Sequence, residues 1–240
     1  MQVIFRALPV YDGDKHFGSS LAFAPDGKLF ITLGERSDRP MRPQAQDLAS
    51  HMGKTIRINA DGSVPSDNPY VGREGALPEI WSLGHRNVQG VAITPTGDVW
   101  TIEHGTRGGD ELNLDRAGVN YGWPIIAYGV EYAGGAINEG VTAREGLEQP
   151  VYYWDPVIAP GGMAFYDGAM FPGWRGNLLV AGLKEKRISR LVLENNRVVG
   201  EEYLLTDLGE RIRDVAVGPD GAVWAITDER DGKLVRLSAQ

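Results

Sequence analysis

Apolar and polar positions alternate along most of the chain, and the alternation recurs in similar segments. Three of them consist of an alternating run, a Pro-x-Gly turn and a second alternating run: LAFAPDGKLFITLGE at 21–35, VAITPTGDVWTIEHG at 91–105 and VAVGPDGAVWAITDE at 215–229. This pattern is typical of a β-hairpin. A looser copy at 163–183 has an expanded turn, and further strand pairs are predicted at 53–64 and 187–200.

The spacing of these hairpins predicts a β-propeller. The copies start at residues 21, 91, 163 and 215, farther apart than the ~40–50 residues of common propeller blades but compatible with blades that carry insertions. Helical periodicity over ten or more residues is hard to find. We therefore expect an all-β chain, a single propeller domain over residues 1–240, with inner hairpins that end at a central axis. Four hairpins predict about four blades, and the strand-like start at Met1 predicts an incomplete ring.

Composition narrows the class of protein and its partners. Hydrophobic residues make up 42% and charged residues 23%, with 32 glycines and 14 prolines, which suits a turn-rich globular protein. A net charge of −8 without a basic stripe argues against nucleic acid. The absence of cysteine excludes disulfides and a thiol nucleophile. No run reaches the ~18 apolar residues of a membrane helix, and the start resembles no signal peptide, so no membrane partner is expected.

The segment EHGTRGGDELN at 103–113 carries three glycines, a histidine and three carboxylates. Its glycine spacing does not match a phosphate-binding loop, and an anion would be repelled by Glu103, Asp110 and Glu111. A cation held by backbone carbonyls, with carboxylates nearby, fits this composition better. A surface turn with solvated charges is the alternative interpretation.

Polar residues precede and follow each predicted hairpin. If the hairpins are radial, their loops meet at one end of the axis and form a local positive group, which favours a polyanionic ligand because arginine forks match carboxylates. Alternatively, Arg211 and Arg213 pair with nearby Asp or Glu. The group consists of His16, Arg86, Asn87, His104, Lys184, Arg211 and Arg213.

Several long motifs, in one order, resemble a known family. They are HFGSSLAFAPDGKLFITLGE, AQDLASHMGKTIRINADGSVPSDNP, EIWSLGHRNVQG, EHGTRGGDELN, NYGWP and GERIRDVAVGPDG. Together they closely resemble the glucose/sorbosone dehydrogenase family, more narrowly the soluble aldose sugar dehydrogenases that use pyrroloquinoline quinone (PQQ). The resemblance runs through nearly the whole chain and corresponds to the C-terminal two thirds of the family's sequence, without its N-terminal blades.

The resemblance implies a six-bladed propeller with PQQ, a tricarboxylate, over the axis beside a calcium ion (Ca2+). His16 would be the general base that takes the sugar C1 hydroxyl proton while the C1 hydride passes to the quinone. Arg86 would polarise the quinone carbonyl, and the backbone carbonyls of Gly105 and Thr106 would bind calcium. The remaining implied cofactor-binding residues are Asn87, His104, Asp110, Lys184, Arg211 and Arg213.

Some positions depart from the glucose-oxidising branch of the family. Lys15 and Glu35 each stand where that branch has Asp, and His104 stands where it has Gln. The last two are similar to the aldose branch, which uses a broader range of substrates. His51 and His85 have no implied role, and both are predicted to be structural.

The resemblance thus predicts an oxidoreductase, a quinoprotein that oxidises aldoses at C1 to lactones and passes electrons to an external acceptor. Two alternatives are a calcium-dependent lactonase-type propeller and a truncated, non-catalytic propeller that acts as a binding module. Exposed blade faces and edges would favour a homodimer or other self-association. The full-length family member would be periplasmic or secreted.

Overall fold

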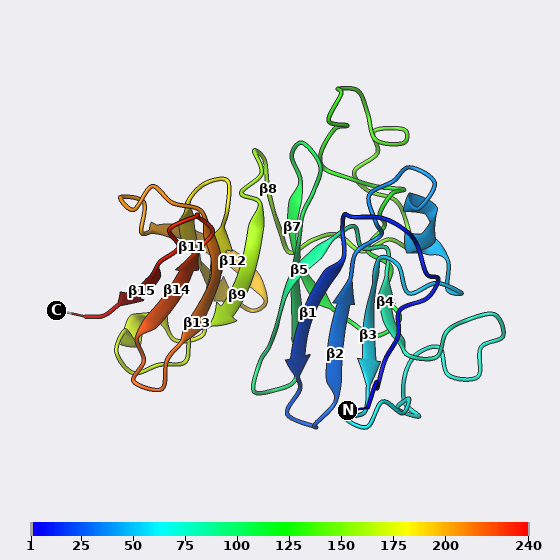
Figure 1. Cartoon of the computed structure of the whole chain (residues 1–240), viewed down its shortest axis with the longest axis horizontal. Coiled ribbons are helices and arrows are strands. Elements are labelled where there is room, and N and C mark those ends of the chain that lie inside the picture. Colours follow the sequence, from blue (N-terminus) through cyan, green and yellow to red (C-terminus); the bar gives the residue numbers. More distant parts are fainter. Residues whose placement is uncertain (1, 240) are drawn as a thin grey trace.

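The computed structural model describes residues 2–239, which form four antiparallel sheets arranged in chain order (Figure 1). Three sheets have four strands each and the last has three. The strands are β1 (Gly18–Phe23), β2 (Leu29–Leu33), β3 (Lys54–Ile58), β4 (Ile80–Leu83), β5 (Val88–Ile93), β6 (Val99–Glu103), β7 (Asp110–Asp115), β8 (Tyr152–Trp154), β9 (Pro160–Phe165), β10 (Leu178–Gly182), β11 (Arg187–Glu194), β12 (Arg197–Leu204), β13 (Ile212–Val217), β14 (Val223–Thr227) and β15 (Leu234–Leu237). Two short 3-10 helices are η1 (Arg42–Gln46) and η2 (Pro172–Trp174).

The first strands of successive sheets lie beside one another, as the inner strands of propeller blades do. β1 contacts β5, β5 contacts β9, and β9 contacts β13. Within each sheet the strands follow the chain as a meander. The sheets β1–β4 and β13–β15 therefore lie at opposite ends of the molecule in Figure 1, with the other two between them. The predicted all-β class is confirmed.

The predicted hairpins are present, and the turn chemistry explains them. In the first, second and last sheets, five residues separate the first strand from the second. The turns are closed by hydrogen bonds such as Gly27 N to Ala24 O and Gly97 N to Thr94 O, each 2.9 Å. The turn glycines Gly27, Gly97 and Gly221 all have positive φ, which a side chain would disfavour. The looser copy forms β9 and β10, with η2 in its expanded turn.

The strand pair predicted at 53–64 was wrong, whereas the pair at 187–200 corresponds to β11 and β12. Residues 54–58 form β3 alone, and the chain then turns, with Asn59 N donating to Ser63 O at 2.9 Å. Asp61 stabilises this turn by accepting hydrogen bonds from the Ser63 main chain and hydroxyl. The partners of β3 are β2 and β4, so its pairing depends on segments that the local pattern does not include.

Packing between the sheets differs from one interface to the next. Trp100, Ile102 and Leu112 belong to an apolar cluster between β5–β8 and β9–β12, and Leu179 and Val215 to one between β9–β12 and β13–β15. Between β1–β4 and β5–β8 the apolar cluster is small, centred on Phe30, and many of the remaining buried positions are polar. Alternation sets this division, because residues 111, 113 and 115 of β7 face opposite to Leu112 and Leu114.

In each sheet the regular pairing of the first and second strands is interrupted near the start of the first strand. The register shifts between Gly18 and Leu21 in β1, between Val88 and Gly90 in β5 and between Ile212 and Asp214 in β13, each near the start of the first strand. The pairing of β9 with β10 shifts near Pro160. Such bulges redirect side chains and end regular pairing. Candidate site residues lie just beside these shifts.

Candidate functional site

Connections into the first strands and out of the second strands meet at one end of the sheets. Main-chain bonds link them, because Glu35 N donates to Arg86 O at 3.0 Å and His104 N donates to Asn87 O at 3.1 Å. The His104 ring lies against the third sheet, with Nε2 donating to Pro160 O at 2.8 Å. The predicted residues His16, Arg86, Asn87 and His104 are thus brought together from the connections of the first two sheets, beside the third.

His16 precedes β1 and is fixed by Glu35, which follows β2. The imidazole Nδ1 lies 2.7 Å from Glu35 Oε1, and the two side chains are 13% and 0% exposed. Burial lowers the pKa of His16, and the positive charges of Arg86 and Arg42 lower it further, against an opposing effect of Glu35. If Glu35 accepts the Nδ1 proton, Nε2 carries the lone pair. The ring is therefore neutral near pH 7 and suited to accept a proton.

The backbone at His16 is held in an unusual conformation. Its φ of 47° lies in the left-handed region, and its carbonyl accepts a hydrogen bond from Arg36 Nη1 at 2.8 Å. Gly34 permits this arrangement, because a Cβ atom there would lie 2.0 Å from His16 O. The position of His16 therefore depends on a glycine at the end of β2.

Arg86 lies in the connection between β4 and β5 and is 3% exposed. Its Nη1 donates to the His104 carbonyl at 3.0 Å and to the Gly105 carbonyl. Its guanidinium carbon lies 5.2 Å from the centre of the Trp123 ring, and its Nε is buried without a partner. One donor of this buried cation thus lacks an acceptor, a state in which an anionic ligand would be stabilising.

Within the 103–113 segment, residues 104–109 form a tight loop between β6 and β7, which Asp110 at the start of β7 supports. Asp110 Oδ1 accepts from Gly105 N at 2.8 Å, and Oδ2 accepts from Ala159 N at 2.7 Å, so one carboxylate links this loop to the entry of β9. Burial raises the pKa of Asp110 to about 6, and burial lowers that of His104 to about 4. The buried Thr106 Oγ1 has no partner.

Arg211 and Arg213 flank the start of β13 and share one carboxylate. Arg211 Nε lies 2.9 Å, and Arg213 Nη2 3.0 Å, from Asp228 Oδ2. This is the pairing that the alternative interpretation expects, but two guanidinium groups on one carboxylate leave net positive charge. Both side chains are about two-fifths exposed, and Arg213 contributes to the lowered pKa of His104. Lys184, after β10, is exposed.

Sequence reasoning missed several residues at this site. Arg42 forms a bidentate pair with Glu131, at 2.5 and 3.0 Å. Next to it, the Tyr132 hydroxyl accepts from Arg86 Nη2 at 3.4 Å, and Trp123 lies between Arg42 and Arg86. These residues come from η1 and from the long connection between β7 and β8, whose placement has no repeat signal. Among the described residues, no cluster of three or more His, Cys, Asp or Glu could hold a metal ion.

The sequence and the fold of the chain are similar to those of known proteins. The model of one family, glucose/sorbosone dehydrogenase, matches residues 1–236. The chain belongs to the glucose/sorbosone dehydrogenase family. It is 43% identical over 239 residues to the aldose sugar dehydrogenase YliI of Escherichia coli, covering 99% of this chain and 64% of that relative. It is 29% identical to quinoprotein glucose dehydrogenase B of Acinetobacter calcoaceticus, covering 91% of this chain and 60% of that protein.

Solved structures of family members superpose on the chain. The soluble aldose sugar dehydrogenase of Escherichia coli, in its apo form, has a TM-score of 0.93 at 42% identity and covers 100% of this chain and 69% of that chain. The PQQ-bound aldose sugar dehydrogenase of Streptomyces coelicolor has a TM-score of 0.75 at 29% identity, covering 96% and 64%. The chain spans 60–64% of the length of these curated family relatives. No helix among residues 2–239 is long and apolar enough to cross a membrane.

Proposed function

We propose that the chain carries the catalytic residues of a quinoprotein that oxidises aldoses at C1 to lactones, with PQQ and calcium, and passes electrons to an external acceptor. The observation that carries this proposal is the His16–Glu35 pair beside Arg86, a buried neutral base next to a buried cation. Membership of a sugar dehydrogenase family supports it. The full ring of six blades, of which these four sheets would form part, belongs to the same proposal.

The charges of the site suit a tricarboxylate such as PQQ. Arg86 has a buried Nε without an acceptor, and Arg211 and Arg213 together have one carboxylate between them. Lys184 is exposed just after β10. Charge-assisted hydrogen bonds from such groups are about twice as strong as neutral ones. Asn87 and His104 complete the proposed binding group. The solved structure of the Streptomyces relative, a PQQ-bound form, supports the same ligand.

The calcium part of the proposal rests on the backbone of the 103–113 loop. The carbonyls of Gly105 and Thr106 would bind calcium, and Asp110 would hold the loop in shape through its bond to Gly105 N. Arg86 Nη1 donates to the Gly105 carbonyl. The proposal therefore requires Arg86 to leave that carbonyl and turn to the anionic cofactor when both bind.

The proposed chemistry assigns one step to each side chain. The quinone, when bound, supplies the two-electron acceptor for oxidation of the sugar. His16 Nε2 takes the proton of the C1 hydroxyl, with Glu35 holding the Nδ1 proton and thereby the tautomer. Arg86 stabilises negative charge that develops beside it. Oxidation at C1 of a cyclic aldose leaves a lactone.

The test is a titration of the purified, metal-stripped chain with PQQ, with and without calcium, followed by glucose and a dye acceptor. We expect calcium-dependent binding and sugar-dependent dye reduction. His16→Ala should lower turnover by about 10²-fold or more, as expected when a general base is lost, and should leave PQQ binding largely intact. His51→Ala serves as a matched histidine control, because His51 contacts Leu8 and Glu79 instead. A folded chain without PQQ binding would reject the proposal for this chain and favour a non-catalytic module.

A further inference from the structure

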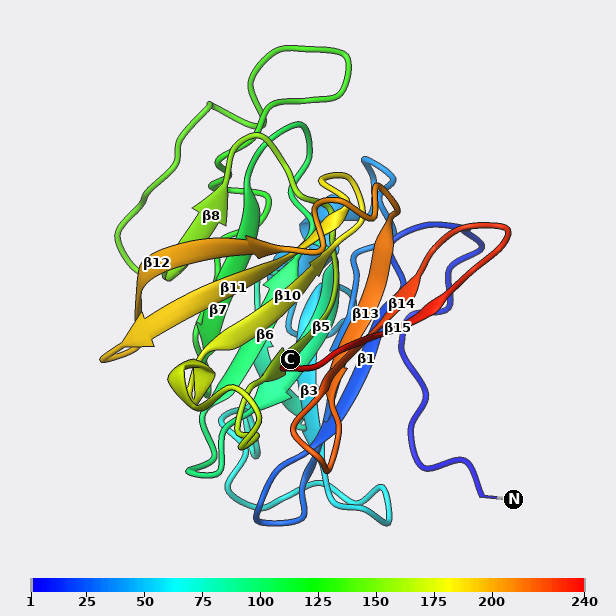
Figure 2. The same cartoon turned by 90° about the vertical axis from the view of Figure 1, so that its left-hand side faces the viewer.

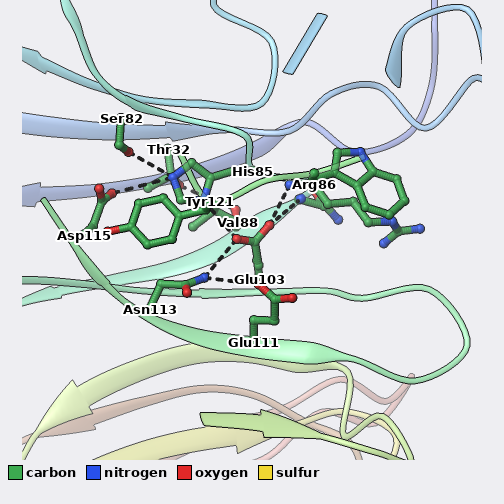
Figure 3. A network of polar contacts seen from close by, with 12 residues as sticks. Thr32, Ser82, His85, Arg86, Val88, Glu103, Glu111, Asn113, Asp115 and Tyr121 are labelled. Atoms are coloured by element: carbon green, nitrogen blue, oxygen red, sulfur yellow. Dashed lines mark hydrogen bonds and ion pairs between the residues drawn. The ribbon is translucent and has the colours of Figure 1, made fainter. Parts of the chain in front are cut away.

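Glu103, the last residue of β6, is a buried carboxylate with partners on both oxygens. Its Oε2 accepts from the backbone N–H of Arg86 at 2.6 Å and of Asn87 at 3.4 Å. Its Oε1 accepts from Asn113 Nδ2 at 3.2 Å and lies 2.9 Å from His85 Nδ1. Figure 3 shows Glu103 between these groups, with His85 on the side of β4 and Asn113 on β7. The residue is 3% exposed, so these contacts replace water.

We propose that Glu103 is a positioning residue that fixes the backbone of Arg86 and Asn87, with His85 as its charge partner, and thereby aims the Arg86 side chain at the site. That the Arg86 side chain faces a cofactor rests on the proposed function. The positioning of the Arg86 and Asn87 backbone does not, because it concerns contacts within the protein itself.

The main chain of Arg86 and Asn87 is held from several directions. Their N–H groups donate to Glu103, while their carbonyls accept from Glu35 N at 3.0 Å and His104 N at 3.1 Å. Without Glu103, two N–H groups in a buried connection would lose their acceptor. A buried N–H group without an acceptor lowers stability more than the loss of an exposed hydrogen bond does. The contacts from Glu35 and His104 hold only the carbonyl groups of Arg86 and Asn87. Glu103 therefore fixes the orientation of their N–H groups.

His85 supplies the opposite charge, and its surroundings support the charged form. Burial by itself would lower the pKa of His85, but attraction and hydrogen bonding by Glu103 and attraction by Asp115 outweigh it, so the pKa is raised. Its Nε2 lies 2.9 Å from Ser82 Oγ and 4.0 Å from Asp115 Oδ2. Lys54 opposes the charge from β3, and the Tyr121 ring stacks on the imidazole at 4.8 Å.

Glu111 is a second carboxyl group beside Glu103. Burial and repulsion by Glu103 raise the pKa of Glu111 well above its ordinary value. Asn113 Nδ2 also approaches Glu111 Oε2, at 3.5 Å, and so lies between the two carboxyl groups. Glu103 and Glu111 are directly opposite each other in β6 and β7.

The first test is amide hydrogen exchange by NMR on the ligand-free full chain. In the wild-type protein the Arg86 amide should be shifted downfield and protected from exchange, as a short bond to a carboxylate requires. Glu103→Gln should speed exchange of Arg86 and Asn87 by about ten-fold or more, the range expected for weakening a hydrogen bond to a charged group. Asn113→Ala is the matched control, because it removes a bond to the same carboxylate but no bond to either amide.

Each outcome decides the inference. Faster exchange at both amides in Glu103→Gln, and not in Asn113→Ala, supports positioning. Equal exchange in wild type and Glu103→Gln, or equal acceleration in the two variants, overturns it in favour of a general packing role. If Glu103→Gln does not fold, the wild-type spectrum decides, since an unprotected Arg86 amide overturns the inference.

A PQQ titration of the same proteins separates this inference from the proposed function. Weaker PQQ binding in Glu103→Gln than in Asn113→Ala would support the aiming of Arg86. If wild type does not bind PQQ but shows the expected exchange pattern, the proposed function fails and the positioning of the backbone stands. Equal PQQ affinity in wild type and Glu103→Gln would overturn the effect on Arg86.

Discussion

At the scale of single residues, the site is built from buried groups whose charges are set by their neighbours. His16 illustrates this, because burial and two arginines lower its pKa while Glu35 raises it. We predict that the His16 imidazole titrates below its ordinary value of 6.5 in the folded chain. Glu35→Gln should move the midpoint lower still, since the opposing effect is removed. NMR of the labelled imidazole would measure both midpoints.

Glu131→Gln is a suitable control for this titration. Glu131 is also paired in the site region, but its partner is Arg42 and not His16. Its removal should change the His16 midpoint less than removal of Glu35. A midpoint in Glu35→Gln that equals or exceeds the wild-type value would contradict the assigned effect of Glu35. The measurement requires neither cofactor nor activity.

His85 makes a second residue-scale prediction, for the free energy of unfolding. Its native pKa is raised, so its stabilising contribution is complete below the unfolded value of about 6.5 and is lost as pH rises through the native pKa. Lys54 has its pKa lowered to about 7 by burial, which gives a slope of opposite sign above that pH. The difference between wild type and His85→Asn therefore isolates the contribution of His85.

Urea denaturation of both proteins at several pH values would measure that difference. The free energy of unfolding of wild type should exceed that of His85→Asn most at about pH 6. This difference should shrink as pH rises above neutrality. A difference that stays constant from acid to alkaline pH would show that folding does not shift the pKa of His85. In that case Glu103 and Asp115 would give the charged form of His85 no net stabilisation.

At the scale of elements, the sequence predicted what is local and missed what depends on packing. The hairpins of the first, second and last sheets follow from turn residues and alternation within about fifteen positions. The false strand after Ile58 arose because its alternation continues into a turn whose Asp61 and Ser63 contacts end the strand. The pattern of apolar positions contains no information about those contacts.

The same limit explains His85 and Glu103. In β6 and β7 the polar members of the alternating pattern, such as Thr101, Glu103 and Asn113, are as buried as the apolar ones. Alternation usually means one face in water, and here the polar face meets the sheet β1–β4 instead. The signal was present as polar residues in strands with apolar neighbours on both sides. The partner sheet that buries them could not be read from the segment itself.

Close contact between elements gives a prediction at Gly34, just after β2. A Cβ atom there would lie 2.0 Å from His16 O, with backbone rather than a flexible side chain in the way. Gly34→Ala should lower the free energy of unfolding by about 1–3 kcal/mol, the usual cost of overpacking, and should displace His16. Urea denaturation and the His16 imidazole shift would measure these effects.

Gly173→Ala provides the comparison for this substitution. Gly173 lies in η2, and a Cβ atom there would meet no other atom within 4 Å. Its unfolding free energy should stay close to that of wild type. Similar losses in both variants would mean that the close approach to His16 relaxes at little cost.

At the scale of the whole molecule, the interfaces between neighbouring sheets differ in polarity. The sheets β5–β8 and β9–β12 pack through a continuous apolar cluster, whereas β1–β4 meets β5–β8 through charged and polar groups near the site. Figure 2 shows the molecule from the β13–β15 side, with β13 and β14 in front of β1. Rigid apolar packing on one side thus supports a polar interface on the other, where side chains must be precisely held.

The outer faces of the first and last sheets carry exposed apolar side chains, which motivates a prediction about association. Leu21 and Phe23 of β1 are 64% and 63% exposed, and Leu234 of β15 is 66% exposed. Grouped apolar side chains of this size favour contact with another surface. We expect sedimentation velocity to show association that increases with protein concentration. The paired substitution Leu21→Lys with Leu234→Lys should weaken it.

A control must separate the effect of added charge from the effect of lost apolar surface, because two added lysines also change the net charge of −8. Val3→Lys with Val10→Lys adds the same charge in the N-terminal segment, where these side chains are 57% and 90% exposed. Association that weakens in the first pair and not in the second locates the contact on the sheet faces. Equal weakening in both would attribute the effect to repulsion, and a wild-type chain that stays monomeric at all concentrations would reject association altogether.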